Sequence, residues 1–569
     1  MLSAAQPQSS NCACKVGGLD EELLGNGASH SACCRADIDE IGDVLDSDDG
    51  EEFGRHGFKL RELWKFTGPA WMVSIAYLDP GNLEVDLQAG AQFGYTLSWV
   101  LLWSSVLGLV IQILALRLGI VTRRHLAEHC RDEYPKPLRY LLWVLSELMI
   151  VASDVPEVIG TAFAIQILSG NTIPLYAGVL LCSFSTVIFL ALTNLGLTFL
   201  TVFIGLLVGV MSACFVAECV LSPPDAAATI SGTFIPFLPA GSENIAVGLL
   251  GAVAMPHNLF LQSALVLSKG VKRERRSIEY ACKYTSIETA IALLVSFFIN
   301  TSVLLVAASS FAPHWCEASE QVCEGSQSEC SAAPSSKCFE VGLETAGILL
   351  QKMVGPRAST LWAVALLASG QSSTITGTYA GQFVMQGFVE LTMPLWARNL
   401  ISRLVAIVPS LMVAIIAGPK GANELIVTAS IVLSLHLPLA LVPLLKFTDS
   451  PLKMGNCCNS RLVSALAWLL TAIVVVANMF LVWTSAIGPL VLHPKENLVQ
   501  LASWTTAIIF YVSLLGYLTF APVVRRSSLP DCIFAGDRSA LAVATQITAP
   551  LLHTRQPETP NEFVESVDQ

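Results

Sequence analysis

Charged residues are scarce in this chain. Asp, Glu, Lys and Arg make up 13% of its 569 residues, whereas 53% are hydrophobic, and the mean hydropathy is +0.61. A soluble domain carries about 25% charged residues. The scarcity excludes a soluble globule of this size and indicates a protein that lies mostly within a membrane.

Other signals are also missing. No charged start, apolar core and small-residue site follow one another at the N-terminus, so we expect no cleavable signal peptide. The cysteines near the N-terminus lack the CxxC spacing of a zinc site. No catalytic constellation is visible, and no feature indicates nucleic-acid binding or a resident cofactor. The sequence therefore predicts a membrane protein that is not an enzyme.

Long apolar runs are what the chain has instead. Runs of about 20 apolar residues can cross the hydrocarbon layer as helices, and about twelve are present. They are centred near residues 75, 107, 152, 183, 207, 255, 297, 370, 409, 434, 473 and 511. The predicted fold class is an all-α polytopic membrane protein with about twelve transmembrane helices.

Basic residues gather in the even-numbered connections, which predicts that both termini are cytosolic. The connection between spans 2 and 3 and that between spans 6 and 7 hold the largest groups: Arg123, Arg124, Arg131, Lys136 and Arg139, then Lys269, Lys272, Arg273, Arg275, Arg276 and Lys283. By contrast, the connection between spans 5 and 6 has no basic residue.

The chain divides by composition into two tails and a membrane domain. The predicted parts are an acidic, disordered cytosolic tail (1–57), spans 1–5 (58–222), spans 6–10 (223–447), spans 11–12 (448–525) and a cytosolic C-terminal tail (526–569). Within 223–447, the loop 313–342 is predicted to be non-cytosolic. It holds Cys316, Cys323, Cys330 and Cys338. Thiols oxidise on that side, so two disulfides are expected there, with unpaired cysteines as the alternative.

Three spans carry ionisable residues at membrane depth, where their cost makes each a functional hypothesis. Span 1 has Asp79, Glu84 and Asp86, span 3 has Asp154 and Glu157, and span 6 has His257.

Two of these spans contain helix breakers at matching places. Pro80-Gly81 follows Asp79 in span 1, and Met255-Pro256-His257-Asn258 interrupts span 6. Two broken spans, five apart, are typical of a leucine-transporter-like 5+5 inverted repeat with its substrate site between the unwound turns. Freed backbone carbonyls there can face a cation.

The side chains at the breaks narrow the substrate. Asp79 and Asn82 offer hard oxygen atoms, and Met255 offers a thioether, which attracts transition metals but not Mg²⁺ or Ca²⁺. The mixture favours a divalent first-row ion such as Mn²⁺ or Fe²⁺. The alternatives are that Met255 fills a gap in the core and that Asp79 only caps a broken helix.

Three motifs at these spans resemble the Nramp family, the natural resistance-associated macrophage proteins. They are DPGN in span 1, AVAMPHN in span 6 and GQSSTITGTYAGQFVMQGF (Gly370 to Phe388) in span 8. The resemblance extends from about Leu60 to Phe447 and is closest in character to plant and algal members. It implies proton-coupled transport of divalent metal ions toward the cytosol.

The resemblance also implies roles for individual residues. Asp79, Asn82, the carbonyl of Ala252 and the sulfur of Met255 match the metal ligands. The matching proton-route residues are Asp154, Glu157, His257, Arg398 and Arg403. For Asp154 and Glu157, a structural ion pair with such an arginine is the alternative. Gln371 and Tyr379 are interpreted as packing and polar contacts in span 8.

The chain departs from the family pattern at two positions. Gln262 stands where a second histidine is usual and cannot titrate, and Ser430 stands where glutamine is usual and is shorter. His436 also occupies a position where glutamine is common. Proton movement through Gln262 and a direct ligand from span 10 are therefore in question.

The resulting hypothesis is a secondary active carrier of Mn²⁺ or Fe²⁺, with Cd²⁺, Co²⁺ and Zn²⁺ as further substrates. Its partners are these ions, protons and the lipid bilayer. Alternatives are an uncoupled metal uniporter, a passive channel, an organic-solute symporter and a transporter-like membrane sensor. The sensor needs a large output domain, whereas only 44 residues follow Arg525. The plasma membrane and vacuolar or endosomal membranes all fit the sequence.

Overall fold

The structure is a computed structural model that describes residues 69–182, 197–269, 271, 274–312, 341–353, 355–391, 395–487 and 498–523. Regular structure in these ranges is helical, without a strand, in agreement with the predicted all-α class. Contacts divide the chain into Met1–Arg55 and His56–Gln569, and the description concerns the second unit. Cys316, Cys323, Cys330 and Cys338 lie outside the described residues, so the disulfides stay a prediction.

The helices of the first half surround the break in span 1. They are α3 (Pro69–Ile75), η1 (Ala76–Leu78), α4 (Pro80–Phe93), α5 (Ser98–Thr122), α6 (Leu126–Glu133), α7 (Lys136–Leu168), α9 (Leu197–Leu221) and α10 (Ala226–Phe234).

The second half begins with the broken span 6. Its elements are α11 (Glu243–Val253), α12 (His257–Leu265), η2 (Val266–Lys269), α13 (Arg275–Ser310), α15 (Leu343–Met353), α16 (Pro356–Val389), α17 (Leu395–Ile416), α18 (Gly418–Asp449), α19 (Pro451–Met454), η6 (Gly455–Cys457), α20 (Arg461–Val482), the π-helical turn η7 (Trp483–Ile487) and α22 (Leu498–Phe520).

Most predicted spans are present as helices. Among the described residues, seven helical segments are long and apolar enough to cross a membrane, and Gly205–Leu221 and Leu400–Ile416 are shorter apolar helices. The broken α3–α4 segment and the 34-residue α16 account for spans 1 and 8. The span centred near residue 183 falls mainly outside the described residues.

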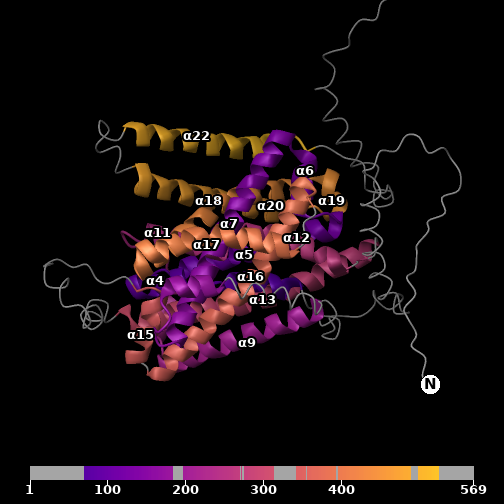
Figure 1. The fold of residues 1–569 in the computed structure, drawn as a ribbon. Helices are drawn as coiled ribbons and strands as arrows, with labels where there is room; N and C mark the ends of the chain where they lie inside the picture. Colours follow the sequence, from indigo (N-terminus) through magenta and orange to yellow (C-terminus); the bar gives the residue numbers. More distant parts are fainter. Residues whose placement is uncertain are drawn as a thin grey trace, which may run out of the picture. The chain divides into compact units, whose positions relative to one another are not determined.

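The helices differ widely in how far they are buried by their neighbours. In the most apolar window of α7, 78% of the residues are buried, and in the α11–α12 segment 83%, whereas only 17% are buried in α22. Helix α7 packs against α16, α17 and α18 in the interior, and α22 lies at an edge of the bundle (Figure 1). The ionisable residues of the sequence analysis therefore lie on inner helices.

The short helix α6 closes the basic connection between α5 and α7. A capping box forms its start, in which the backbone N–H of His125 donates to Glu128 at 3.0 Å. Its His129 is hydrogen-bonded to Thr122 at 2.8 Å, and Lys453 forms an ion pair with Glu133 at 2.8 Å. Helix α6 is thereby tied to both α5 and the connection after α18.

Candidate metal-binding site

The predicted break in span 1 is confirmed, and Asp79 stands at its centre. Its backbone is extended (φ −76°, ψ 163°), and it is the N-cap of α4, with Pro80 as the first helical residue. Its Oδ1 accepts hydrogen bonds from the backbone N–H of Asn82 at 2.8 Å and from its Nδ2 at 2.7 Å. One carboxylate oxygen thus holds the helix start, which agrees with the capping alternative.

The remaining oxygen atoms of this pair are available for another task. Asp79 Oδ2 and Asn82 Oδ1 are buried and accept no hydrogen bond, and the two residues are only 2% and 1% exposed. A buried carboxylate without a counter-charge is costly, so its second oxygen needs a cation or a proton. Asp79 can therefore cap the helix through Oδ1 and still offer Oδ2 to an ion.

Two backbone carbonyls beside the break in span 1 accept hydrogen bonds from side chains of other helices. Asn300 donates from Nδ2 to the carbonyl of Tyr77 at 2.9 Å, and the hydroxyl of Ser369 donates to the carbonyl of Leu78. Two carbonyls just before Asp79 are thus satisfied by side chains of α13 and α16. These hydrogen bonds stabilise the break.

Span 6 is broken as predicted, between Val253 and His257. Pro256 has no N–H, so it cannot donate to the carbonyl of Ala252, its partner four residues earlier in a continuous helix. Ala252 and Met255 are each 1% exposed. The carbonyl that the family resemblance implies as a ligand is therefore one that proline chemistry leaves without its helical donor.

The two broken segments pack against each other and against α7. A Cβ at Gly248 of α11 would lie 3.3 Å from Val85 of α4, and a Cβ at Gly81 would lie 3.3 Å from Pro156 of α7. At Gly160 of α7 a Cβ would come within 2.3 Å of Pro80. Glycine at position 160 is what allows α7 to lie directly on the break.

The acids of α7 face the same region. A Cβ at Gly377 of α16 would lie 3.1 Å from Asp154 Oδ1 and 3.7 Å from Glu157 Oε1, so both carboxylates point toward one spot on α16. Asp154 and Glu157 are 3% and 1% exposed. Their three-residue spacing places both carboxylates on one face of α7.

Both predicted arginines of α17 form ion pairs with α7. Arg403 donates from Nη2 to Glu157 at 2.7 Å, deep in the bundle. Arg398 binds both oxygens of Glu147, at 2.8 Å and 2.5 Å. The sequence analysis did not single out Glu147. Its spacing of seven and ten residues before Asp154 and Glu157 on one helix is the signal that could have found it.

The remaining span-6 candidates are buried without full partners. His257 Nδ1 accepts and donates no hydrogen bond, and neither side-chain atom of Asn258 is paired. Groups of three or more His, Cys, Asp or Glu that could hold a metal ion do not occur in the described part of the chain. The predicted set of Asp79, Asn82, Ala252 and Met255 contains only one residue of these four types, Asp79.

Comparison with known proteins decides the family. The model of natural resistance-associated macrophage protein-like (Nramp) proteins matches residues 70–484. The chain belongs to the Nramp family. This match contains both breaks, the acids of α7 and the arginines of α17.

Its relatives in this family are transporters. The Arabidopsis thaliana metal transporter Nramp6 is 47% identical over 78% of this chain and 81% of its own length. The Oryza sativa metal transporter Nramp3 is 45% identical over 85% of each chain. A crystallised manganese transporter of Eremococcus coleocola has a TM-score of 0.67 and 28% identity, over 81% of this chain and 96% of its own. The prediction of a transporter rather than an enzyme is confirmed.

The side chains at the two departures from the Nramp pattern, Gln262 and Ser430, are both hydrogen-bonded. Gln262 is fully buried and donates from Nε2 to Thr289 of α13 at 3.2 Å. Ser430 donates to the carbonyl of Ile426 in its own helix at 3.2 Å. Gln371 donates to Thr161 at 3.4 Å, which fits its interpretation as a polar contact between helices.

Proposed function

We propose that this Nramp protein is a secondary active transporter that carries divalent transition-metal ions, Mn²⁺ and Fe²⁺ foremost, toward the cytosol by alternating access. The observation that carries the proposal is Asp79 Oδ2, a buried carboxylate oxygen without a partner at a helix break. The relatives named as metal and manganese transporters support the same substrate class.

The proposed ligands are Asp79, Asn82, the carbonyl of Ala252 and the sulfur of Met255. One carboxylate, one amide oxygen and one carbonyl suit any hard divalent ion. The thioether adds affinity only for transition metals, because Mg²⁺ and Ca²⁺ gain nothing from sulfur. Selection against the abundant alkaline-earth ions is therefore assigned to Met255.

We assign proton coupling to the acids and arginines between α7 and α17. The guanidinium of Arg403 pairs with Glu157, and Asp154 lies on the same face of α7 as Glu157. Asp79 lies at the break beside α7, without a basic partner among the ion pairs of the described residues. A divalent ion at Asp79 compensates the excess of negative charge, and a proton compensates part of it when the ion is absent. The pair of Arg398 and Glu147 continues the row of charges along α7.

The basic connections predict how the protein is oriented in the membrane. The residues around α6, including Arg123, Arg124 and Arg131, are expected in the cytosol with both termini. We propose inward alternating access, in which the segments broken at Asp79 and Met255 shift against the helices that hold them. Protease or antibody access to a tag at either terminus in sealed cells tests this orientation, because a tag reached from outside contradicts it.

The test of function is Mn²⁺ uptake into proteoliposomes that contain the purified protein. Uptake and internal pH are followed together, with and without an inward proton gradient and with excess Mg²⁺ as competitor. Uptake that resists Mg²⁺ and acidifies the interior supports a coupled metal carrier. Uptake without proton entry means that the protein is an uncoupled uniporter. The departures from the family pattern at Gln262 and Ser430 are then the first candidates for the loss of coupling. Absence of Mn²⁺ uptake contradicts the proposal.

A further inference from the structure

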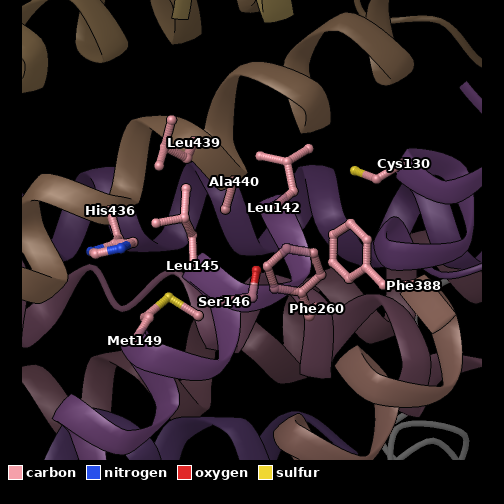
Figure 2. Close-up of a pocket in the computed structure, with 10 residues that line it drawn as sticks. All are labelled: Cys130, Leu142, Leu145, Ser146, Met149, Phe260, Phe388, His436, Leu439 and Ala440. Atoms are coloured by element: carbon pink, nitrogen blue, oxygen red, sulfur yellow. The ribbon is translucent and has the colours of Figure 1, made fainter. Parts of the chain in front are cut away.

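A small cavity lies apart from the broken turns, where α6, α7, α12, α16 and α18 meet (Figure 2). Its volume is about 10 Å³, close to the space that one water-sized species occupies. On α7, its residue Met149 precedes Asp154 by five positions, and on α12 its residue Phe260 follows Met255 by five. The residues that line the cavity do not include any of the proposed transport ligands.

Most of the cavity wall is apolar. His436 of α18 is among its few polar residues, and its imidazole can act as a metal ligand through one ring nitrogen. Its Nδ1 is 2.9 Å from the carbonyl oxygen of Val432, one turn earlier. A carbonyl can only accept, so Nδ1 carries the hydrogen and Nε2 keeps its lone pair. No hydrogen bond to Nε2 is present within the described ranges. A histidine fixed in this tautomer by a backbone carbonyl is the usual form of a metal ligand.

A second donor of matching softness lines the same cavity. Met149 of α7 is 2% exposed, and Figure 2 shows its thioether at the same end of the cavity as the His436 ring. Imidazole nitrogen and thioether sulfur together favour soft transition-metal ions over hard ones. The hydroxyl of Ser146, one turn before Met149, also reaches this cavity.

The charge of the ligand follows from the donors. Imidazole, thioether and hydroxyl are all neutral, so none of them compensates the charge of a bound ion. Desolvation cost rises with the square of the charge, and an apolar wall therefore tolerates a monovalent ion far better than a divalent one. Cu⁺ and its analogue Ag⁺ combine the required softness with a single charge.

The cysteine of the cavity is a poor competitor for such an ion. Figure 2 shows Cys130 at the other end, beyond the rings of Phe260 and Phe388. Burial raises the pKa of the Cys130 thiol in α6, so an ion that binds this sulfur has to displace a proton first. A metal ligand has to be the thiolate.

We propose that Met149 and His436 form a second metal site, distinct from the transport site, that binds a soft monovalent ion of the Cu⁺ class. Such an ion joins α7, which carries the acids Asp154 and Glu157, to α18. The substrate set of this site differs from that of the carrier, because Mn²⁺ prefers oxygen donors.

The test is calorimetric titration of the purified full chain with Ag⁺ in detergent, after N-ethylmaleimide has blocked accessible thiols. Four variants are compared with the wild type: Met149→Leu, His436→Gln, His436→Met and Cys130→Ser. We expect Met149→Leu and His436→Gln to lose one bound Ag⁺ or to bind it at least about tenfold more weakly. His436→Met keeps a soft donor and should retain the ion.

The controls separate this site from its neighbours. Cys130→Ser should bind Ag⁺ as the wild type does, since Cys130 supplies no ligand to the proposed site. Equal Ag⁺ binding by the wild type and His436→Gln overturns the proposal, and so does loss of the ion in Cys130→Ser alone. Mn²⁺ uptake by His436→Gln serves as the folding check. Failure of Mn²⁺ uptake in every protein contradicts the proposed transport function and leaves the Ag⁺ comparison intact.

Discussion

Helix α20 and the α11–α12 segment rank in opposite order by hydropathy and by burial. The most apolar window of α20 has a mean hydropathy of 2.4 with 33% of its residues buried, whereas that of Glu243–Lys269 has 1.4 with 83% buried. In a soluble protein the more apolar helix is expected inside. In a membrane protein the outer helices face lipid, which is as apolar as leucine, and the inner ones hold the polar groups.

This difference identifies where function can lie. Helix α22 is also little buried by its neighbours: 17% of its most apolar window is buried, and side chains such as Val499 and Phe520 are exposed. The inner segments instead bury carboxylates, amides and a histidine. If the comparison is right, equal substitutions in the two regions must have very different effects.

The largest effect is expected at Asp79. Asp79→Ala removes the carboxylate of the proposed site and the N-cap of α4, and Mn²⁺ uptake in proteoliposomes should fall at least about 100-fold. The matched change at the edge is Thr505→Ala in α22, whose exposed hydroxyl only donates to the carbonyl of Leu501. Thr505→Ala should transport as the wild type does. Full uptake by Asp79→Ala would remove Asp79 from the site.

The ion pair of Arg403 and Glu157 comes next. Arg403→Ala leaves the Glu157 carboxylate buried and unpaired, which costs about 3–5 kcal/mol of folding free energy. The double variant with Glu157→Gln should recover most of that loss, because the unpaired charge is gone. Arg275→Ala, which breaks an exposed pair with Glu279, is the control and should leave thermal stability unchanged. Wild-type stability of Arg403→Ala in a melting experiment would contradict a buried structural pair.

Two glycines test the packing side of the comparison. At Gly160 an added methyl group would lie 2.3 Å from Pro80, so Gly160→Ala should destabilise the protein by about 1–3 kcal/mol and reduce uptake. At Gly516 of α22 nothing lies within 4 Å, and Gly516→Ala should stabilise the helix by roughly 0.5–1 kcal/mol. Melting temperatures of the purified variants measure both. Equal shifts at the two sites would mean that α7 does not lie directly on the break.

Met255 is expected to affect selectivity more than rate. Met255→Ala keeps the oxygen ligands and removes the thioether, so competition by Mg²⁺ and Ca²⁺ against Mn²⁺ should rise about tenfold, equivalent to about 1.4 kcal/mol. Met479→Ala in α20, outside the proposed site, is the control. An unchanged ion profile for Met255→Ala would return Met255 to the role of a packing residue.

The smallest effect concerns His129 in α6, outside both regions. Burial lowers its pKa well below the usual value of about 6.5, with Lys453 and Arg124 acting in the same direction. As the pH falls below about 6.5, the unfolded chain binds a proton at this residue that the folded protein refuses, so stability is lost, by at most about 1.4 kcal/mol per pH unit. His129→Gln should therefore show a smaller drop in melting temperature between pH 7.5 and 5.5. Identical pH profiles would contradict a buried neutral His129.

Much of the candidate site could be predicted from local features. Pro80 and Pro256 each remove a donor from a helix, and the structure has a break at both places. Asp154 and Glu157 share a face because a helix repeats every 3.6 residues. The N-cap bond, in which Asp79 accepts from the backbone N–H of Asn82, joins residues three apart and agrees with one of the alternatives considered.

Other features depend on distant parts of the chain. The carbonyls of Tyr77 and Leu78, just before the break, accept hydrogen bonds from Asn300 and Ser369, which lie 223 and 291 residues away. Glu147 was overlooked: its spacing before Asp154 and Glu157 could have indicated it, but its partner lies on a distant part of the chain. Arg398, 251 residues later, is that partner.

The sequence by itself determined the spans, the two breaks, the buried acids and the family resemblance, because hydropathy, proline chemistry and motif spacing are properties of short stretches. Only the tertiary structure decided that Arg403 pairs with Glu157 and Arg398 with Glu147, and that Met149 and His436 line one cavity. Those partners lie on helices far apart in the chain. Their meeting is set by how α7, α17 and α18 pack, which no local pattern encodes.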